Sequence, residues 1–284
     1  MNARHGVRMM QRFLIFAVLA FGTISAHAEA LKVCLLASSP PYSDQQNNAG
    51  FDHDVGQLVA ARIGRTFEAV WIRNDANIVE IDESDFPLHR LEHGGCDLLL
   101  SVPGPATDTL SRHGGLALGP AYYGAAFQLM SCGAEVQSTF RGLRGRSVAI
   151  QSQTIAHFAL VMVKAKPLNF FSIDDAYRAV ADGEADAGLL WGPAIGSRLK
   201  SDGSAAQCQL VPDYEPPAAV RWNLHPAFRS DATALSASIM SALEALEQDG
   251  SLEAVMRRYG IPDHRPFATT YGLGAINELE RPPR

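Results

Sequence analysis

Trp191 has the clearest potential for ligand contact, because it ends a short apolar stretch. The sequence DAGLLWGP, residues 186–193, carries one charge, at Asp186, and predicts a buried strand. In open α/β sheets, ligands bind beyond the carboxyl ends of the strands. An indole placed there offers an apolar face and one N–H donor, held by a turn at Gly192 and Pro193. We therefore predict a ligand contact at Trp191; the alternative is that the ring fills this space or packs between two parts of the chain.

Recognisable catalytic motifs are absent from the sequence. It contains no GxSxG, HExxH or GxxxxGK[ST] motif and no Cys–His pair at an informative spacing. His89 and His93 are four residues apart on a predicted short helix and could hold a metal. No third metal ligand is evident nearby in the sequence, so we interpret them as surface residues. We expect a binding protein and not an enzyme, with no metal and no cofactor.

The first 28 residues predict an export signal. Three arginines precede an apolar stretch at 13–25, which is short for a membrane span, and the tripeptide AHA at 26–28 fits the cleavage rule. Cleavage after Ala28 would give a periplasmic chain with no membrane span, and an uncleaved anchor is the alternative. The formal net charge of −6, with no basic stripe, indicates that the protein does not bind nucleic acid.

Strands and helices alternate twice along the chain. The first set, in the order strand, helix, strand, helix, strand, is predicted at 31–37, 50–64, 66–72, 86–95 and 96–102. The second set, in the same order, is predicted at 147–152, 154–165, 169–173, 172–183 and 185–191. This pattern is typical of parallel sheets covered by helices. We expect an α/β protein of two lobes, each with a mostly parallel sheet.

Two hinge crossings are expected to join the lobes. Lobe one is predicted at 29–123 and 219–267, and lobe two at 124–218. Two amphipathic helices within 230–260 have no strands of their own to cover, so we assign them to lobe one. The tail, 268–284, lacks a strong period, and we expect a loosely held extension. The chain is expected to be a monomer that bends at the hinge.

The four cysteines predict two disulfides. An even number in an exported protein favours disulfides over free thiols, and no CxxC spacing suggests a metal or redox motif. Three pairings are possible, and the residues alone do not choose among them. The two-lobe architecture favours one disulfide within each lobe, Cys34–Cys96 and Cys132–Cys208.

Three stretches carry a resemblance to a known family. They are GFDHDVGQLVAARIG at 50–64, FRGLRGRSVAIQSQT at 140–154 and LEQDGSLEAVMRRYGIP at 246–262. Their order and spacing resemble family 3 of the periplasmic solute-binding proteins, over residues 31–262. The resemblance implies the type II periplasmic binding fold, with a ligand held between the lobes.

Two further stretches are similar to a narrower branch of that family. CDLLLSVP at 96–103 and DGEADAGLLWGPAIG at 182–196 resemble the binding-protein-like subunit that accompanies PQQ-dependent alcohol dehydrogenases. The resemblance implies an accessory protein whose partner is the quinoprotein dehydrogenase or its cytochrome. The alternative is a receptor that delivers a small organic anion to an ABC permease. A prephenate-type dehydratase, the remote alternative, would need a general acid, for which Glu184 is the one candidate.

The family resemblance also suggests which residues contact a ligand. Family members that bind amino acids hold the ligand carboxylate with an arginine, and Arg112 is the matching residue; a solvated surface charge is the alternative. In family members, the N-terminus of a helix in lobe two also contacts the ligand carboxylate. The matching residues here are Gln151, Ser152 and Thr154; the alternative is that Ser152 or Thr154 forms an ordinary helix cap. Tyr42 matches an aromatic ligand wall, or is an exposed turn residue.

At the fifth position after Asp186, the family's amino-acid binders carry an aspartate that neutralises the ligand ammonium. Trp191 occupies that position here. Losing this carboxylate should weaken a zwitterion by on the order of a hundredfold, so the resemblance disfavours an amino acid as ligand. Asp52 and Asp54, in the first turn of a predicted helix, are interpreted as solvated acids.

Overall fold

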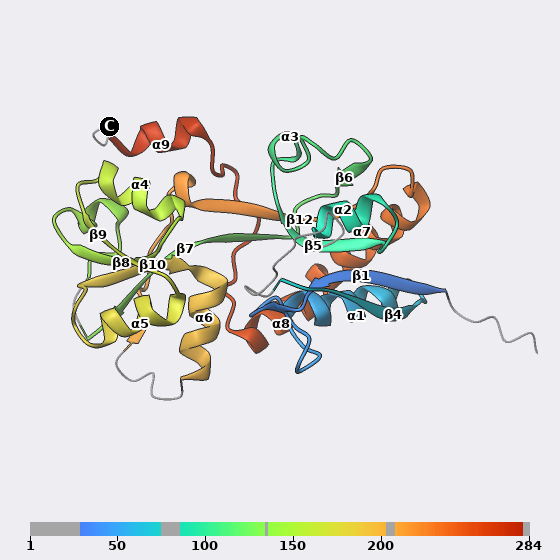
Figure 1. Cartoon of the computed structure of the whole chain (residues 1–284), viewed down its shortest axis with the longest axis horizontal. Helices are drawn as coiled ribbons and strands as arrows, with labels where there is room; N and C mark the ends of the chain where they lie inside the picture. Colours follow the sequence, from blue (N-terminus) through green and yellow to red (C-terminus); the bar gives the residue numbers. More distant parts are fainter. Residues whose placement is uncertain (1–28, 75–85, 134–135, 203–207, 281–284) are drawn as a thin grey trace, which may run out of the picture.

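The described chain forms the predicted α/β fold of two lobes (Figure 1). The computed structural model describes residues 29–74, 86–133, 136–202 and 208–280. The predicted signal segment, 1–28, lies outside them. One continuous sheet runs through both lobes, with the strand order β4-β1-β5-β12-β7-β10-β8-β9.

Lobe one is built on three parallel strands, β1 (Ala30–Leu36), β4 (Thr66–Ile72) and β5 (Leu98–Pro103). Leu31, Val33 and Leu35 of β1 point to a core shared with α1 (Phe51–Arg62), α7 (Thr233–Gln248) and α8 (Ser251–Tyr259). Cys34 faces the other way, toward α2 (Pro87–Glu92). Both faces of the sheet are therefore apolar, as a parallel sheet covered on both sides requires.

Lobe two repeats this arrangement with β8 (Ser147–Gln151), β9 (Lys166–Phe170) and β10 (Ala187–Trp191). Val148, Ile150 and Leu189 pack against α4 (Ile155–Met162). Ala149 and Leu190, on the opposite face, pack against α5 (Ile173–Ala181) and α6 (Gly192–Ser201). The period of two along each strand thus assigns alternate residues to the two helix layers.

Two long strands, β7 (Tyr123–Cys132) and β12 (Arg221–Arg229), cross between the lobes and pair with each other in antiparallel register, Arg221 opposite Ala126. The pattern-based prediction did not identify β12. The remaining short elements are β2 (Ser38–Ser39), β3 (Ser43–Asp44), α3 (Ala106–Thr109), β6 (Leu116–Leu118), β11 (Cys208–Leu210) and two 3-10 turns, Phe140–Leu143 and Ala218–Val220. The exact residues that bound each lobe stay a prediction.

The favoured disulfide pairing is confirmed. Cys34 of β1 is bonded to Cys96, which precedes β5, with the Cα atoms 5.6 Å apart. Cys132 at the end of β7 is bonded to Cys208 of β11, the residue directly opposite it in the sheet. Each bond links segments that are also neighbours in the sheet of one lobe.

The described part of the C-terminal tail is attached to lobe two, so the expectation of a loosely held extension is wrong for these residues. Residues Leu273–Glu280 form α9, which lies against α4 of lobe two (Figure 1). Leu279 is buried in the lobe-two core, and Ile276 packs against it. A helix of eight residues is too short to show a clear hydrophobic period, so only its tertiary contacts reveal that it is attached.

Candidate ligand-binding site

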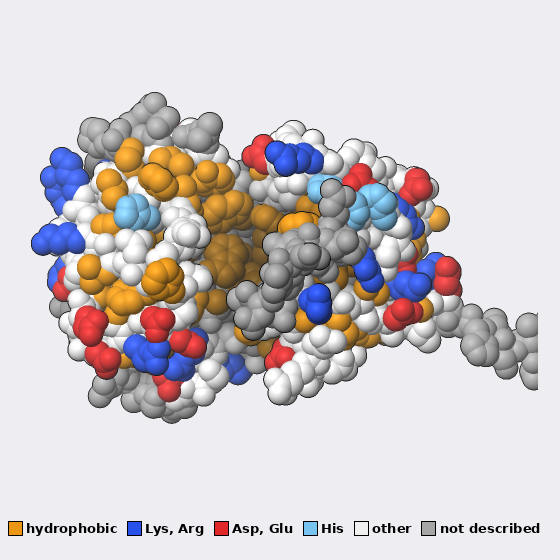
Figure 2. All heavy atoms as spheres, in the orientation of Figure 1, with side chains coloured by type: hydrophobic (Ala, Val, Ile, Leu, Met, Phe, Trp, Pro, Cys, Tyr) orange, Lys and Arg blue, Asp and Glu red, His pale blue; other side chains and the backbone are white. Residues whose placement is uncertain are grey.

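A cavity of about 570 Å³ lies between the two lobes. Figure 2 shows hydrophobic side chains at the bottom of the hollow that separates them. The cavity walls come from β1, the loop after it, α1, α2, β5, α3, β7, β10 and β12, and their apolar residues include Leu35, Leu36, Leu88, Leu99, Leu100, Val102, Phe127, Trp191, Trp222 and Leu224. Its volume falls within the range of about 300–1,000 Å³ that is usual for small-molecule pockets.

Trp191 lines this cavity and also packs between the lobes. Its ring makes edge contacts with Phe127 and Trp222, with centroids 5.5 and 5.8 Å away. Its Nε1–H donates to the hydroxyl of Tyr42 at 3.0 Å, across the gap from lobe two to lobe one. The two interpretations offered for Trp191 are thus compatible, but its one N–H donor is bonded to Tyr42.

The chain continues from Trp191 directly into α6, which corrects the turn expected at Gly192 and Pro193. Proline tolerates the first turn of a helix, because the N–H it lacks would have no partner there. Gly192 is required by packing: a Cβ at this position would lie 2.7 Å from the carbonyl oxygen of Ala126 on β7. This close approach fixes the start of α6, and hence the indole, against β7.

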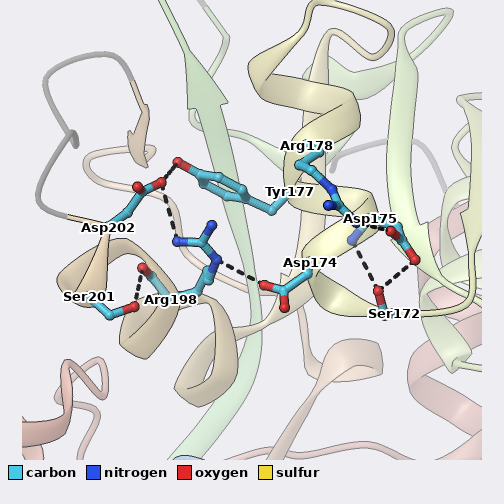
Figure 3. A network of polar contacts seen from close by, with 8 residues as sticks. All are labelled: Ser172, Asp174, Asp175, Tyr177, Arg178, Arg198, Ser201 and Asp202. Carbon is cyan, nitrogen blue, oxygen red and sulfur yellow. Dashed lines mark hydrogen bonds and ion pairs between the residues drawn. The ribbon is translucent and has the colours of Figure 1, made fainter.

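A polar network on the outside of lobe two ties α6 to α5 (Figure 3). The Arg198 guanidinium donates to Asp174 at 2.8 Å and lies 3.2 Å from the Asp202 carboxylate. Asp202 also accepts from the hydroxyl of Tyr177, and the guanidinium lies over the Tyr177 ring, 4.5 Å from its centroid. Several linked charges stabilise more than an isolated surface pair, so this network supports the helix that begins beside Trp191.

Asp52 is the one carboxylate of the described cavity lining, and the sequence-based interpretation of it as a solvated acid was wrong. It is only 8% exposed, and its Oδ1 accepts from Ser101 Oγ at 2.6 Å. Burial raises the pKa of this carboxyl to about 7, although the hydrogen bond from Ser101 acts in the opposite direction. Asp54 is not simply solvated either, because it accepts hydrogen bonds from Arg258 and Tyr259.

A short chain of hydroxyls links Asp52, through Ser101, to Tyr122, which is outside the described cavity lining. Ser101 lies in β5 with a φ of 54°, a left-handed conformation that is uncommon outside glycine. Its N–H donates to the hydroxyl of Tyr122 at 2.9 Å, and its Oγ lies 3.1 Å from the same oxygen. Strained backbone of this kind collects at functional sites. Here it accompanies the bonds from Ser101 to both Asp52 and Tyr122.

Of the six predicted ligand residues, the structure brings Tyr42 and Trp191 together. Arg112 is exposed and is absent from the described cavity lining, because the residues after β5 form α3 and carry it away. Gln151 ends β8, Ser152 follows it and Thr154 is the N-cap of α4, and all three lie outside the same lining. Thr154 Oγ1 donates to the Gln151 carbonyl, at the edge of a separate depression near Phe158.

Asp52, Phe127 and Trp222 are cavity residues that the sequence reasoning missed. Asp52 carried a signal, because the residue before it in the same predicted helix, Phe51, is apolar, and the structure buries Phe51 in the lobe-one core. Phe127 and Trp222 belong to the two crossing strands, and only the pairing of those strands brings them together. Among the described residues, no group of three His, Cys, Asp or Glu side chains could hold a metal, and no helix is long and apolar enough to cross a membrane.

The Trp191–Tyr42 hydrogen bond should contribute about 1 kcal/mol to the contact between the lobes. Trp191→Phe and Tyr42→Phe each remove one partner and keep an aromatic ring. We expect a coupling free energy of about 1 kcal/mol from the double-mutant cycle, measured by urea unfolding. Trp222→Phe combined with Tyr42→Phe is the control, because no hydrogen bond joins these described side chains. Equal coupling in the two cycles would contradict the assignment.

Solved structures support the fold. The chain is similar to the L-cystine solute receptor of Neisseria gonorrhoeae in its unliganded open conformation, with a TM-score of 0.67, 16% identity, and coverage of 84% of this chain and 96% of that one. It is equally similar to the second substrate-binding domain of GlnP from Lactococcus lactis, also open, with a TM-score of 0.67, 14% identity, and coverage of 84% and 99%.

An ancestral cationic amino acid solute-binding protein gives a TM-score of 0.64 at 20% identity, covering 81% of this chain and 95% of that one. At these identities the likeness concerns the fold alone. No curated protein sequence matches the chain. The sequence model of the bacterial extracellular solute-binding proteins, family 3, matches residues 31–262, which is most of the chain. The protein therefore belongs to family 3 of the bacterial extracellular solute-binding proteins.

Proposed function

We propose that the protein is a periplasmic receptor that captures a small organic solute between its lobes and delivers it to an ABC permease. One observation carries this proposal, the cavity of about 570 Å³ whose walls come from both lobes. Tyr42 of lobe one and Trp191 of lobe two both line it and are joined by a hydrogen bond, so an occupant beside them would touch both lobes at once. A ligand that contacts both lobes favours their closure, which is the usual response of a hinged binding protein.

The residues that line the cavity do not fit the small organic anion that the sequence suggested as an alternative ligand. A small organic anion would need a cationic partner, and no Lys, Arg or His side chain belongs to the described lining. The proposed solute is therefore not an anion. The association with a quinoprotein dehydrogenase or its cytochrome stays a prediction from the resemblance, because the matching family and the similar structures do not include such a subunit among their names.

Thermal unfolding with a panel of amines, amino acids, alcohols and carboxylic acids tests the receptor function. A solute at a hundred times its Kd should stabilise the protein by about 2.7 kcal/mol, since it binds only the folded state. Leu99→Trp, which places a large ring in the cavity, should abolish the stabilisation. Val161→Trp, on an exposed position of α4, is the matched control and should respond like the wild type.

The proposal fails if no solute of the panel stabilises the wild type, or if Leu99→Trp responds as strongly as Val161→Trp. Fluorescence provides a second measurement if Leu99→Trp does not fold. Trp191 and Trp222 line the cavity, whereas Trp71 packs against the lobe-one core. A bound solute should therefore change the emission of Trp71→Phe protein, in which only the two cavity indoles remain.

A further inference from the structure

The described cavity lining is asymmetric in charge. Asp52 is its one carboxylate, and no basic side chain belongs to it. The other polar side-chain groups are the indole N–H groups of Trp191 and Trp222 and the hydroxyls of Ser39, Tyr42, Ser43, Ser101 and Thr109, and the rest of the wall is apolar. A lining of this kind provides a counter-ion for one positive charge and nothing that would neutralise a negative one.

The Asp52 carboxylate is only partly satisfied within the protein. Oδ1 accepts from Ser101 Oγ, whereas Oδ2 has no hydrogen-bond partner among the described residues. Asp52 is more than nine-tenths buried. No described Lys, Arg or His lies within ion-pair distance of its carboxylate to compensate for this burial. The first turn of α1 provides some compensation, because a helix N-terminus favours a negative charge. A buried carboxylate with a free oxygen facing a cavity is arranged to meet a cation from outside.

The same lining argues against the carboxylate of an amino acid. If an ammonium group paired with Asp52, the carboxylate of an amino acid would be enclosed among leucines and tryptophans without a cationic partner. Burying an unpaired charge in such surroundings is strongly unfavourable. An apolar body is accommodated much better, because Phe127, Trp191 and Trp222 form a continuous aromatic wall that can also attract a cation.

We infer that the cavity binds an organic monocation, a primary amine with an apolar body and no carboxylate, whose ammonium group pairs with Asp52. This inference rests on the proposed receptor function and narrows it to one class of solute. The ammonium would donate to the free Oδ2 of Asp52, and the apolar body would lie against Trp191 and Trp222.

Calorimetric titration with matched probes tests the inference. Two series share their apolar bodies and differ in charge: 2-phenylethylamine, 2-phenylethanol and L-phenylalanine, and hexylamine, hexanol and hexanoate. At pH 8 we expect at least one amine to bind about a hundredfold more tightly than its alcohol and its carboxylate-bearing partner. Asp52→Asn should remove this advantage by weakening the amine about a hundredfold and leaving the alcohol unchanged.

Asp54→Asn is the matched control, in the same turn of α1 but bonded to Arg258 and Tyr259 outside the cavity. It should leave the amine affinity within about twofold of the wild type, as expected for a charge that does not meet the ligand. Unfolding curves of both variants establish that each is folded at the temperature of the titration.

The pH dependence gives an independent measurement. Burial holds the pKa of Asp52 near 7, so a proton competes with the amine below that pH and the affinity should fall by up to about tenfold per pH unit. The other titratable groups that face Asp52 are Tyr42, Tyr122 and Tyr123, and burial raises the pKa of each, so they stay neutral across this range. Asp52→Asn should remove the dependence.

The outcomes separate the inference from the receptor function. If an alcohol, a carboxylic acid or an amino acid binds as tightly as the amines, or if Asp52→Asn leaves amine binding unchanged, the inference is overturned and the receptor function stands. If no amine binds while another solute stabilises the wild type, the inference again fails alone. If no solute of any class binds, both fail.

Discussion

Replacing Asp52 with asparagine should stabilise the protein without ligand at pH 8, by on the order of 4 kcal/mol. Burial raises the pKa of this carboxyl from 3.8 to about 7, and each unit of pKa corresponds to about 1.36 kcal/mol. The folded state therefore disfavours the ionised form relative to the unfolded chain. Asparagine has a similar shape, carries no charge and can still accept the hydrogen bond from Ser101.

The raised pKa of Asp52 makes the free energy of unfolding depend on pH between about 4 and 7. Because the pKa is raised in the folded state, the contribution of Asp52 is most favourable below pH 4 and is lost as the pH rises through about 7. The difference in unfolding free energy between Asp52→Asn and the wild type should thus grow from pH 4 to pH 7 and stay constant above it. Other titrating groups cancel in this difference.

Urea unfolding at intervals between pH 4 and pH 8 measures this difference. Asp54→Asn is the control, and it should not gain stability at high pH, because Asp54 accepts hydrogen bonds from Arg258 and Tyr259. An Asp52→Asn difference that does not change with pH, or a variant less stable than the wild type at pH 8, would show that the carboxylate is not held in an unfavourable environment.

Removing the disulfide of lobe one should have an effect of similar size and opposite sign. The Cys34–Cys96 bond closes a loop with a sequence separation of 62 residues, for which the chain-entropy relation gives about 4 kcal/mol at 25 °C. Both cysteines are buried, and Cys34 lines the cavity beside Leu35. The double variant Cys34→Ala, Cys96→Ala should therefore be less stable by about that amount.

Guanidinium unfolding of the double variant measures the loss, with the slope on denaturant checked against the wild type. The matched comparison is Cys132→Ala, Cys208→Ala, whose separation of 76 residues predicts almost the same entropic loss from the other lobe. If one variant loses less than about 1 kcal/mol while the other loses the full amount, the effect depends on local packing and not on loop closure.

Much of the fold could be predicted from the sequence. Apolar runs such as Leu31–Ala37 and Ala187–Trp191, alternating with helical periods, indicate parallel strands covered on both faces, because only that arrangement buries them. Two such units in succession predict two lobes, and the lobes favoured the observed disulfide pairing. The position of Trp191 at the end of its strand also predicted a place in the cavity, because parallel strands direct their carboxyl ends to one edge.

The charge of the site was decided by the tertiary structure. Asp52 looks like any acid in the first turn of a helix, and sequence periodicity cannot show that Ser101 and Tyr122 cover that turn. These residues are 49 and 70 positions away along the chain, and they meet Asp52 only through the pairing of β5 with β1 and the crossing of β7. Arg112 shows the converse, since a local match in spacing could not reveal that α3 carries it to the surface.

The sequence by itself thus determined the alternating strands and helices of the two repeats, their order and the favoured cysteine pairing, because these depend on local periodicity and on the burial of apolar faces. It did not reveal β12, α6 or α9. Only the tertiary structure decided which polar groups face the cavity, because solvent exposure of a side chain depends on segments far away in the sequence. The site therefore has a buried carboxylate where the local pattern indicated a solvated one.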